Sequence, residues 1–223
     1  MIRTYKVVLE GLTPLLMHWD NIEWADQMEE WKSDPRNKKR SKAGDDRSPA
    51  FRWIGSVYHD GESVCIAADN ISRCLMEGGA MVPVPGGRSG KTFKAQTQSG
   101  MKVDEMFVPL IVNGTKSIPW EPIQALMNEH SFAAHMAAVK TLGFRLFIKR
   151  ARIGASKHVR VRPRFDQWKV QTQISVWDDQ LTETVLTDIF TFSGTYKGLC
   201  DWRPGSKTPG SYGMFRLVSL RAV

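Results

Sequence analysis

Cysteine is scarce in this sequence of 223 residues, and its few cysteines are isolated from one another. Cys65, Cys74 and Cys200 are odd in number, and none belongs to a Cys-x-x-Cys pair. Disulfide-stabilised domains and cysteine-rich zinc sites need several cysteines at regular spacings. The sequence therefore predicts neither, and free thiols of this kind are typical of a protein in the reducing cytoplasm.

Long apolar runs are also missing. A membrane-spanning helix needs about 18 or more predominantly apolar residues in a row, and no segment comes near that length. Residues 1–6 lack the apolar stretch of a secretory signal. We therefore expect neither a membrane partner nor export.

Motifs for catalysis are absent as well. The five histidines form no HxH or HExxH pattern, and there is no signature of a Ser or Cys nucleophile. Gly90-Lys91-Thr92 resembles the end of a phosphate-binding loop, but Pro85 stands where that loop needs its first glycine. The loop still offers Arg88 and Lys91 to a phosphate. We expect no catalytic residue, no metal ligand and no cofactor, and hence no enzyme; a nucleotide hydrolase acting through Lys91 is the disfavoured alternative.

Positive charge is what the sequence has in excess, and it is concentrated. The 31 Lys and Arg residues outnumber the 23 Asp and Glu residues, which gives a net charge of +8. Residues 130–165 contain nine basic residues and no acidic one, and a second basic cluster lies between residues 36 and 42. A local excess of this kind is typical of a surface that contacts a phosphate backbone.

The apolar pattern predicts both strands and helices. Alternation, or a run of β-branched and aromatic residues, predicts strands at 3–12, 107–112, 144–153, 159–162, 168–177 and 214–223. Helical spacing predicts helices at 70–77 and from 181 to a glycine at either 194 or 198. Residues 121–139 are ambiguous, and the polar stretch 20–50 is predicted to hold a short helix at best.

These elements predict an α+β fold. A strand and a helix near each end of the chain combine into a ferredoxin-like or RRM-like antiparallel sheet with helices on one face. We expect a single elaborated domain over residues 1–223. Its insertions would lie at about 19–56 and about 82–165, and the second would include a basic β-hairpin.

The basic segment contains the first candidate site. Arg160, Arg162 and Arg164 follow a period of two, so one face of their strand is predicted to be an arginine ladder, with residues 154–157 at the hairpin tip. Planar guanidinium groups bind phosphates bidentately and stack on bases. The candidate nucleic-acid-binding residues here are Arg145, Lys149, Arg150, Arg152, Lys157, Arg160, Arg162 and Arg164. The alternative is a solvated basic face without a partner.

A glycine-rich segment, residues 198–213, supplies the second candidate site. Its glycines permit a close approach of the backbone, and it adds two cations and two aromatic faces on which bases can stack. The candidate residues are Trp202, Arg203, Lys207 and Tyr212. The alternative is an ordinary mobile connection. His18 beside Trp19 likewise has two interpretations, base stacking or a structural role.

Three short segments resemble a known family. Residues 4–18, a strand running into Gly-Leu-Thr-Pro-Leu-Leu-Met-His, look like the opening of the RAMP superfamily, specifically of Cas7-like backbone subunits of CRISPR effector complexes. Residues 198–215 are similar to the glycine-rich loop before the last strand of those subunits. With Arg162-Pro-Arg-Phe-Asp-Gln-Trp168, this loop most resembles small proteins encoded by bacteriophages and prophages. The matches cover about a quarter of the chain and are short.

The resemblance implies a modified RRM fold in which the hairpin at 144–164 is a thumb-like projection. It implies a partner of single-stranded nucleic acid, with RNA favoured over DNA, and self-association into a filament or ring along that strand. It further implies CRISPR-type or phage protein partners and the cytoplasm of a bacterial host cell. Met214 departs from the family where a basic residue often stands, and no His or Asp is placed for RNA cleavage. The resemblance therefore supports binding and assembly and leaves nuclease activity without support.

Two other functions stay open. One is a phage protein that binds or anneals single-stranded DNA. The other is a phage protein-interaction module that mimics a Cas7-like subunit and inhibits a bacterial complex. The first would share the basic surface described above, whereas the second would bind a protein partner and show little salt-sensitive affinity for nucleic acid.

Overall fold

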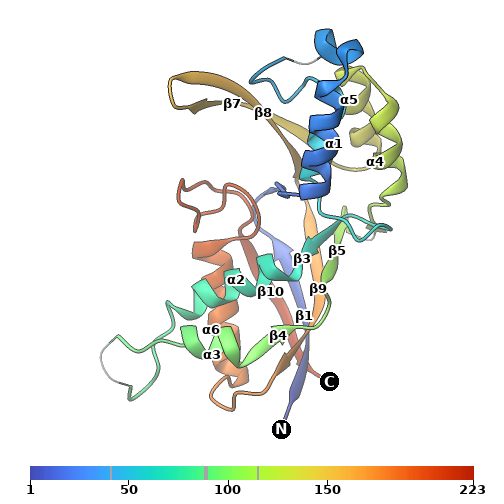
Figure 1. The fold of residues 1–223 in the computed structure, drawn as a ribbon. Coiled ribbons are helices and arrows are strands. Elements are labelled where there is room, and N and C mark those ends of the chain that lie inside the picture. The colour runs from blue at the N-terminus through green and yellow to red at the C-terminus, as the bar shows by residue number, and fades with distance from the viewer. Residues whose placement is uncertain (41, 88–89, 115) are drawn as a thin grey trace. The chain divides into compact units, whose positions relative to one another are not determined.

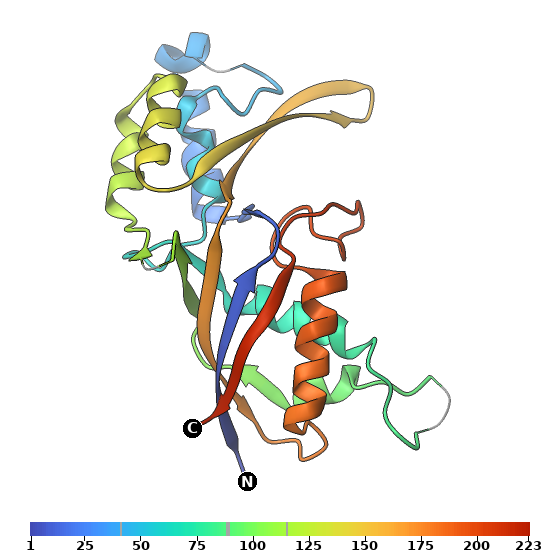
Figure 2. The same ribbon diagram turned by 180° about the vertical axis from the view of Figure 1, so that it is seen from behind.

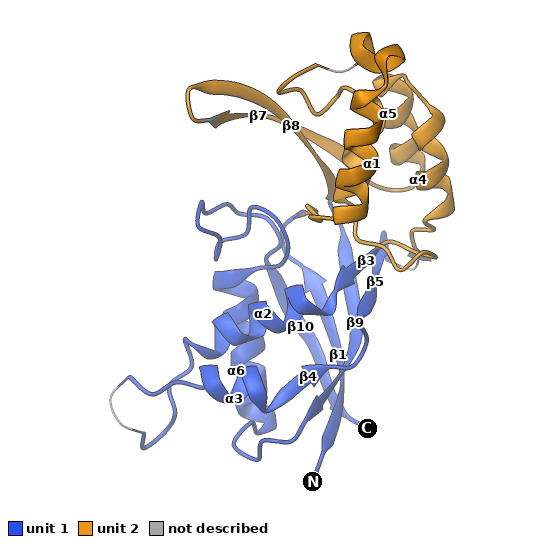
Figure 3. Cartoon of the chain, in the orientation of Figure 1, with its two compact units in different colours: residues 1–15, 65–116, 166–223 blue, residues 16–64, 117–165 orange. Residues whose placement is uncertain are grey.

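The computed structural model describes nearly the whole chain, which forms two compact units (Figures 1 and 3). The described residues are 1–40, 42–87, 90–114 and 116–223, except for the side chains of Lys116 and Ile153. Arg88, which the sequence offers to a phosphate, lies outside the described residues. Unit 1 comprises Met1–Leu15, Cys65–Lys116 and Asp166–Val223, and unit 2 comprises Leu16–Val64 and Ser117–Phe165.

The boundaries of the units differ from those of the predicted insertions. The predicted insertion at 19–56 falls within the first segment of unit 2. Of the second, 82–165, residues 82–116 belong to unit 1, and the remainder belongs to unit 2. The first insertion and the later part of the second therefore belong to one compact body.

The centre of unit 1 is an antiparallel sheet. Its strands follow the order β10 (Phe215–Ala222), β1 (Arg3–Gly11), β9 (Trp168–Val176), β5 (Phe107–Val112) and β3 (Cys65–Ala67). Two short strands extend it, β4 (Met101–Val103) beside β9 and β6 (Lys116–Ser117) beside β5. All the strand pairs along the main path are antiparallel. Figure 2 shows β10, β1 and β9 side by side.

Helices cover one face of this sheet (Figures 1 and 2). These are α2 (Ala68–Gly79), α3 (Lys94–Ser99) and α6 (Glu183–Phe192). Alternate residues of β1 are buried, and α6 contributes Leu186, Ile189 and Phe190 at helical spacing, so apolar side chains from both layers form the core. Thr182 begins α6 by accepting a hydrogen bond from the Val185 amide at 3.4 Å.

The order of elements in unit 1 confirms the predicted fold class. Strand β1 is followed by α2, then β5 and β9, then α6 and β10, with β1 between β10 and β9 in the sheet. This β-α-β-β-α-β succession is the ferredoxin-like pattern, and the fold is α+β with a mostly antiparallel sheet. The predicted strands and helices of this unit are present within about two residues of their expected ends.

Unit 2 combines helices with a long β-hairpin. Its α-helices are α1 (Ile22–Ser33), α4 (Glu121–Ala125) and α5 (Phe132–Thr141), and 3₁₀ helices occupy Pro35–Arg40, Ala50–Ser56 and Leu126–Asn128. The hairpin consists of β7 (Arg145–Ile153) and β8 (Ser156–Phe165), with β2 (Leu15–Leu16) on the other side of β8. The polar stretch that was predicted to hold a short helix at best contains the 12-residue α1.

A buried histidine lies at the centre of unit 2. The Trp53 indole N–H donates to Nδ1 of His135 at 3.1 Å, and Nε2 of His135 lies 3.0 Å from the Glu129 carbonyl oxygen. Nδ1 is therefore the acceptor and Nε2 the donor, which is the arrangement of a neutral ring. Burial lowers the pKa of His135 more than its contacts with Glu129 raise it.

Among the residues that the structure describes, no helix combines the length and the apolar character required to cross a membrane.

The neutral state of His135 makes the stability of the protein depend on pH. Because folding lowers the pKa of this ring, its contribution is complete above the ordinary pKa of 6.5 and is lost as the pH falls below that value. We expect the free energy of unfolding to fall by about 1 kcal/mol between about pH 7.5 and about pH 5.5. Urea unfolding followed by tryptophan fluorescence measures this.

The substitution His135→Gln is the matched test, because a Gln side chain keeps an acceptor for Trp53 and does not titrate. The variant should lose less stability on acidification than the parent protein. His59, whose pKa is also lowered chiefly by burial, accounts for a remaining dependence. Equal losses in parent and variant would show that His135 is not the group responsible.

Candidate nucleic-acid interface

Pairing of β7 with β8 determines which side chains of the basic segment share a face. Nine residue pairs run from Arg145 opposite Arg164 to Ile153 opposite Ser156. Both strands predicted in this segment are present, and β8 begins three residues earlier than expected. Gly154 has a φ of +58° in the turn between them, within the predicted tip.

One face of the hairpin carries most of the predicted cations. Residues directly opposite each other in an antiparallel pair project to the same side, and so do alternate residues along each strand. This face, called the ladder face here, is formed by Arg145, Phe147 and Lys149 on β7 and by Arg160, Arg162 and Arg164 on β8. Five cations therefore surround one phenyl ring. Phe147 was not among the predicted residues, although its position between Arg145 and Lys149 at a period of two was a signal for it.

The opposite face divides into an apolar base and a basic tip. Leu146, Val161 and Pro163 are buried near the base. Toward the tip, Arg150, Arg152 and Lys157 project on this side, and the Arg152 side chain donates to the Gly154 carbonyl at 3.1 Å. The structure therefore separates these three predicted residues from the other five.

A buried carboxylate holds the arginines at the base of the ladder face. Asp46 is 4% exposed, and it lies 3.1 Å from the Arg160 guanidinium, 3.6 Å from that of Arg162 and 3.5 Å from that of Arg52. Its backbone N–H donates to the Val159 carbonyl at 2.9 Å, which aligns residues 44–46 with β8. Three guanidinium groups thus share a single carboxylate.

The charge of the chain resides in this part of the molecule. Nine of the 31 basic residues lie between residues 130 and 165, and the other 22 are balanced by all 23 acidic residues. Eight of the nine are on the two strands of the hairpin. Because residues 130–165 contain no acidic residue, the sequence of the hairpin itself is strongly basic.

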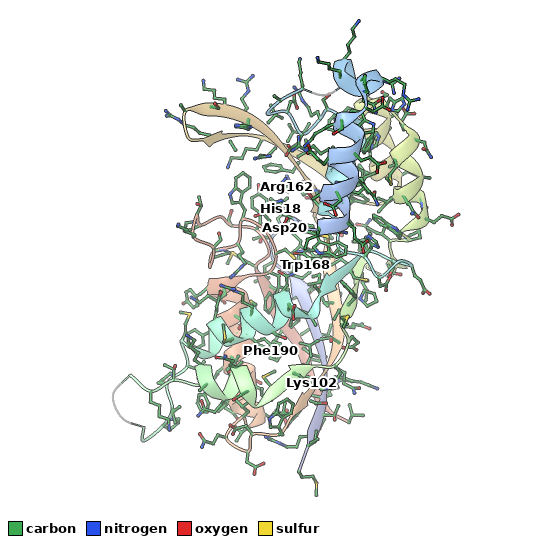
Figure 4. All side chains as sticks on the ribbon, viewed as in Figure 1. His18, Asp20, Lys102, Arg162, Trp168 and Phe190 are labelled. Atoms are coloured by element: carbon green, nitrogen blue, oxygen red, sulfur yellow. The ribbon has the colours of Figure 1, made fainter. Side chains whose placement is uncertain are left out.

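A cavity of about 400 Å³ opens beside the ladder face within unit 2, and it is called the arginine pocket here. Its charged and aromatic lining consists of His18, Trp19, Asp20, Trp24, Glu29, Lys32, Asp46, Arg52, Trp53, Arg160 and Arg162. Figure 4 shows three of these, His18, Asp20 and Arg162, close together beside α1. Arg52 and Asp46 carried no sequence signal, because only the tertiary fold brings them to β8.

Aromatic packing fixes two of the three indoles that line the arginine pocket, those of Trp19 and Trp24. Trp19 stacks on Tyr58 with ring centroids 5.4 Å apart and planes 21° apart. Trp24 lies directly against Gly55, where a Cβ atom would come within 1.9 Å of the indole ring. Phe51 meets Trp24 edge to face. Both indoles are therefore held in place before any ligand arrives.

The glycine-rich segment of unit 1 is a closed loop with a defined backbone. The N–H of Gly213 donates to Pro14 at 2.8 Å, and its carbonyl accepts from Leu199 at 2.9 Å. Gly213 has a φ of +69°, and a Cβ atom there would lie 2.0 Å from the Leu199 oxygen. These hydrogen bonds favour a shaped loop over an ordinary mobile connection.

Within this loop, the candidate residues are engaged with one another or with unit 1. The Arg203 guanidinium donates to both carboxylate oxygens of Glu77, at 2.7 and 3.1 Å. Trp202 and Tyr212 stack with centroids 6.4 Å apart, while Lys207 is exposed. Burial opposes the ionisation of Glu77, but the hydrogen bonds from Arg203 and Arg73 outweigh it and lower the pKa. Arg203 thus anchors the loop to α2.

The open face of the sheet offers no stacking platform on its central strands. In RRM domains, aromatic side chains on this face stack on bases. Here the alternate residues that face away from the helices are Thr4, Lys6, Val8 and Glu10 on β1, and Lys169, Gln171, Gln173 and Ser175 on β9. Because none is aromatic, the sheet lacks the chemistry that RRM domains use there.

The geometry around the cysteines and Lys91 offers little for catalysis. Burial raises the pKa of the Cys200 thiol to about 12, so this thiol is a poor nucleophile. The loop that contains Lys91 is closed by pairing of Pro83 with Thr92, and the helix that follows, α3, has six residues. A Walker A loop instead joins a strand directly to a helix. Among the described residues, no cluster of three or more His, Cys, Asp or Glu could hold a metal ion.

The Arg203–Glu77 pair yields a test of the anchoring role. We expect Arg203→Met to lower the free energy of unfolding by about 2 kcal/mol, less than for a fully buried pair because both side chains keep some exposure. The double variant Glu77→Met/Arg203→Met should recover part of that loss, since it leaves no carboxylate without a partner. Urea denaturation compares the three proteins. A loss below about 0.5 kcal/mol in the single variant would refute the anchoring role.

Comparisons with known proteins do not indicate a function for this chain. No protein-family model matches the chain, and no curated protein shows significant similarity to it. The fold class therefore stands on the structure, and the resemblance to Cas7-like proteins stands on the three short segments that carry it.

Proposed function

We propose that the protein binds a single strand of nucleic acid along the ladder face and carries out no catalysis there. The observation that carries this proposal is the register of β7 and β8, which puts five cations and Phe147 on one side of a two-stranded ribbon. An alternating basic sequence can also arise in an unpaired segment. A row of guanidinium groups beside an aromatic ring, set by the pairing of two strands, is more specific to polyanions that carry bases.

The dimensions of a strand support contact with successive phosphates. Alternate residues in a β-strand lie roughly 6.8 Å apart, so Arg160, Arg162 and Arg164 form a row of roughly 14 Å. Guanidinium groups bind phosphates through two parallel hydrogen bonds, and cations in a row track a backbone without reading its sequence. A flexible single strand can follow such a row and present bases to Phe147.

The choice between RNA and DNA, and the self-association of the protein along the strand, are argued from the resemblance to Cas7-like proteins. RNA is favoured over DNA, and self-association along the strand is expected, because Cas7-like backbone subunits are built in that way. The ladder face would serve a phage protein that binds single-stranded DNA equally well. Parallel binding measurements with RNA and DNA of the same sequence separate these two versions of the proposal.

The two faces of the hairpin provide a test with a matched control. Arg145→Gln/Lys149→Gln removes two charges from the ladder face, and Arg150→Gln/Arg152→Gln removes two from the opposite face. Single-strand affinity depends on salt with a logarithmic slope of about −0.7 for each neutralised phosphate. We expect the ladder-face variant to weaken binding and to reduce the slope by about 1.4, with a smaller change in the control.

Fluorescence anisotropy of a labelled 5′-hydroxyl oligonucleotide across a salt series measures both quantities. Equal effects in the two variants would mean that binding follows net charge and not the ladder face. Absence of salt-sensitive binding by the parent protein would refute the proposed function. The remaining alternative would then be a phage protein-interaction module that mimics a Cas7-like subunit.

A further inference from the structure

The arginine pocket has a chemistry different from that of the exposed ladder face. It is a concave site, whereas the ladder is an open row, and Arg160 and Arg162 contribute to both. A continuous backbone of phosphate diesters needs only the row. The pocket can therefore bind a ligand that the ladder face does not require. Its size, charge and lining indicate the chemical class of that ligand.

The guanidinium groups of the pocket match a terminal phosphate. Arg52, Arg160 and Arg162 surround Asp46, and together with Lys32 these cations outnumber the three carboxylates that line the pocket, Asp20, Glu29 and Asp46. A phosphate monoester carries about −1.5 to −2 at neutral pH, more than the single charge of a diester within a strand. Guanidinium groups bind such a group through paired hydrogen bonds. The side chains of Arg52 and Arg160 are 32% and 30% exposed, so a ligand can reach them.

The start of helix α1 adds to the attraction for an anion. Asn21 caps this 12-residue helix by accepting a hydrogen bond from the Trp24 amide at 3.3 Å, and both residues line the pocket. The first amide groups of a helix carry partial positive charge and point out of its N-terminus. A phosphate between β8 and α1 would therefore be favoured from two sides.

The rest of the pocket fits the other parts of a nucleotide. Its volume of about 400 Å³ exceeds what a phosphate ion needs and lies within the range of small-molecule sites. Trp19 and Trp24 provide fixed aromatic walls for a base. Asp20 and Glu29 also line the pocket and would repel a simple anion, but carboxylates accept hydrogen bonds from hydroxyl and amino groups.

We infer that the arginine pocket binds a nucleotide through its terminal phosphate monoester, with the phosphate on Arg52, Arg160 and Arg162 and the base between the indoles. The ligand is either a free nucleoside monophosphate or the phosphorylated end of a strand, which share this chemistry. The inference goes beyond strand binding along the ladder face, because a mononucleotide needs the pocket alone.

Titration of the full-length protein with 5′-AMP, adenosine and inorganic phosphate tests the site. Trp19 and Trp24 supply the signal through their fluorescence, and calorimetry gives the affinity independently. We expect 5′-AMP to bind at least about tenfold more tightly than adenosine, because the phosphate contributes charge-assisted hydrogen bonds. It should also exceed inorganic phosphate, which lacks a base to stack. Equal affinity for 5′-AMP and adenosine, or no binding of 5′-AMP, would overturn the inference.

The ladder face contains a matched pair of arginines for mutation. Arg160 and Arg164 lie on the same face of β8, but only Arg160 is among the residues that line the pocket. We expect Arg160→Gln to weaken 5′-AMP binding about tenfold or more and Arg164→Gln to change it less than about twofold. Arg52→Gln should repeat the effect of Arg160→Gln from a different segment, which guards against a local folding defect on β8. Equal effects of Arg160→Gln and Arg164→Gln would overturn the assignment.

Oligonucleotides with and without a 5′-phosphate distinguish the two sources of the ligand. If the ligand is a strand end, the phosphorylated oligonucleotide binds more tightly and 5′-AMP competes away that difference. If it is a free nucleotide, 5′-AMP binds but the two oligonucleotides behave alike. Failure of the pocket leaves the binding of the 5′-hydroxyl oligonucleotide and its dependence on Arg145 and Lys149 intact, so the two proposals fail separately.

Discussion

The carboxylate of Asp46 is the group around which the base of the hairpin and the arginine pocket are organised. Three guanidinium groups from two segments of the chain, one carrying Arg52 and the other Arg160 and Arg162, converge on it. Without a carboxylate between them, like charges at these distances would repel each other. One buried anion thus holds the base of the ladder face together, and it shapes one end of the arginine pocket.

Unit 1 and unit 2 differ in regularity, and both proposed sites lie in unit 2. Unit 1 is a regular ferredoxin-like sheet whose open face has no aromatic residue on β1 or β9, and its glycine-rich loop uses Arg203 to attach itself to α2. Unit 2 is irregular, and it contains the ladder face and the pocket. Folds of this type tolerate insertions between their elements, and new sites commonly arise in such insertions.

Local periodicity carried most of what could be predicted from the sequence. The alternation along residues 168–177 and the period of two at Arg160, Arg162 and Arg164 are properties of single strands, so both were legible. Arg145 and Arg150 lie on opposite faces of the hairpin. Alternation along β7 already implied this separation, but a count of the charges in the whole segment did not reveal it. The pocket was out of reach, because Arg52 and Trp24 join Arg160 only through contacts between distant segments. Helix α1 was underestimated, since its weak apolar stripe consists only of Trp24, Met28 and Trp31 in an otherwise polar sequence.

The interleaved course of the chain sets the order in which its parts can fold as it leaves the ribosome. Unit 2 is complete once residue 165 has emerged, because both of its segments precede that point. Strand β1 is synthesised before unit 2, yet its neighbours in the sheet are β9 and β10, whose residues are synthesised more than 150 positions later. Both hydrogen-bonding edges of residues 3–11 therefore stay unpaired until β9 and β10 have been synthesised and unit 1 can assemble. A strand whose edges stay unpaired over more than 150 residues of synthesis is a hazard for aggregation, and a chaperone could protect it.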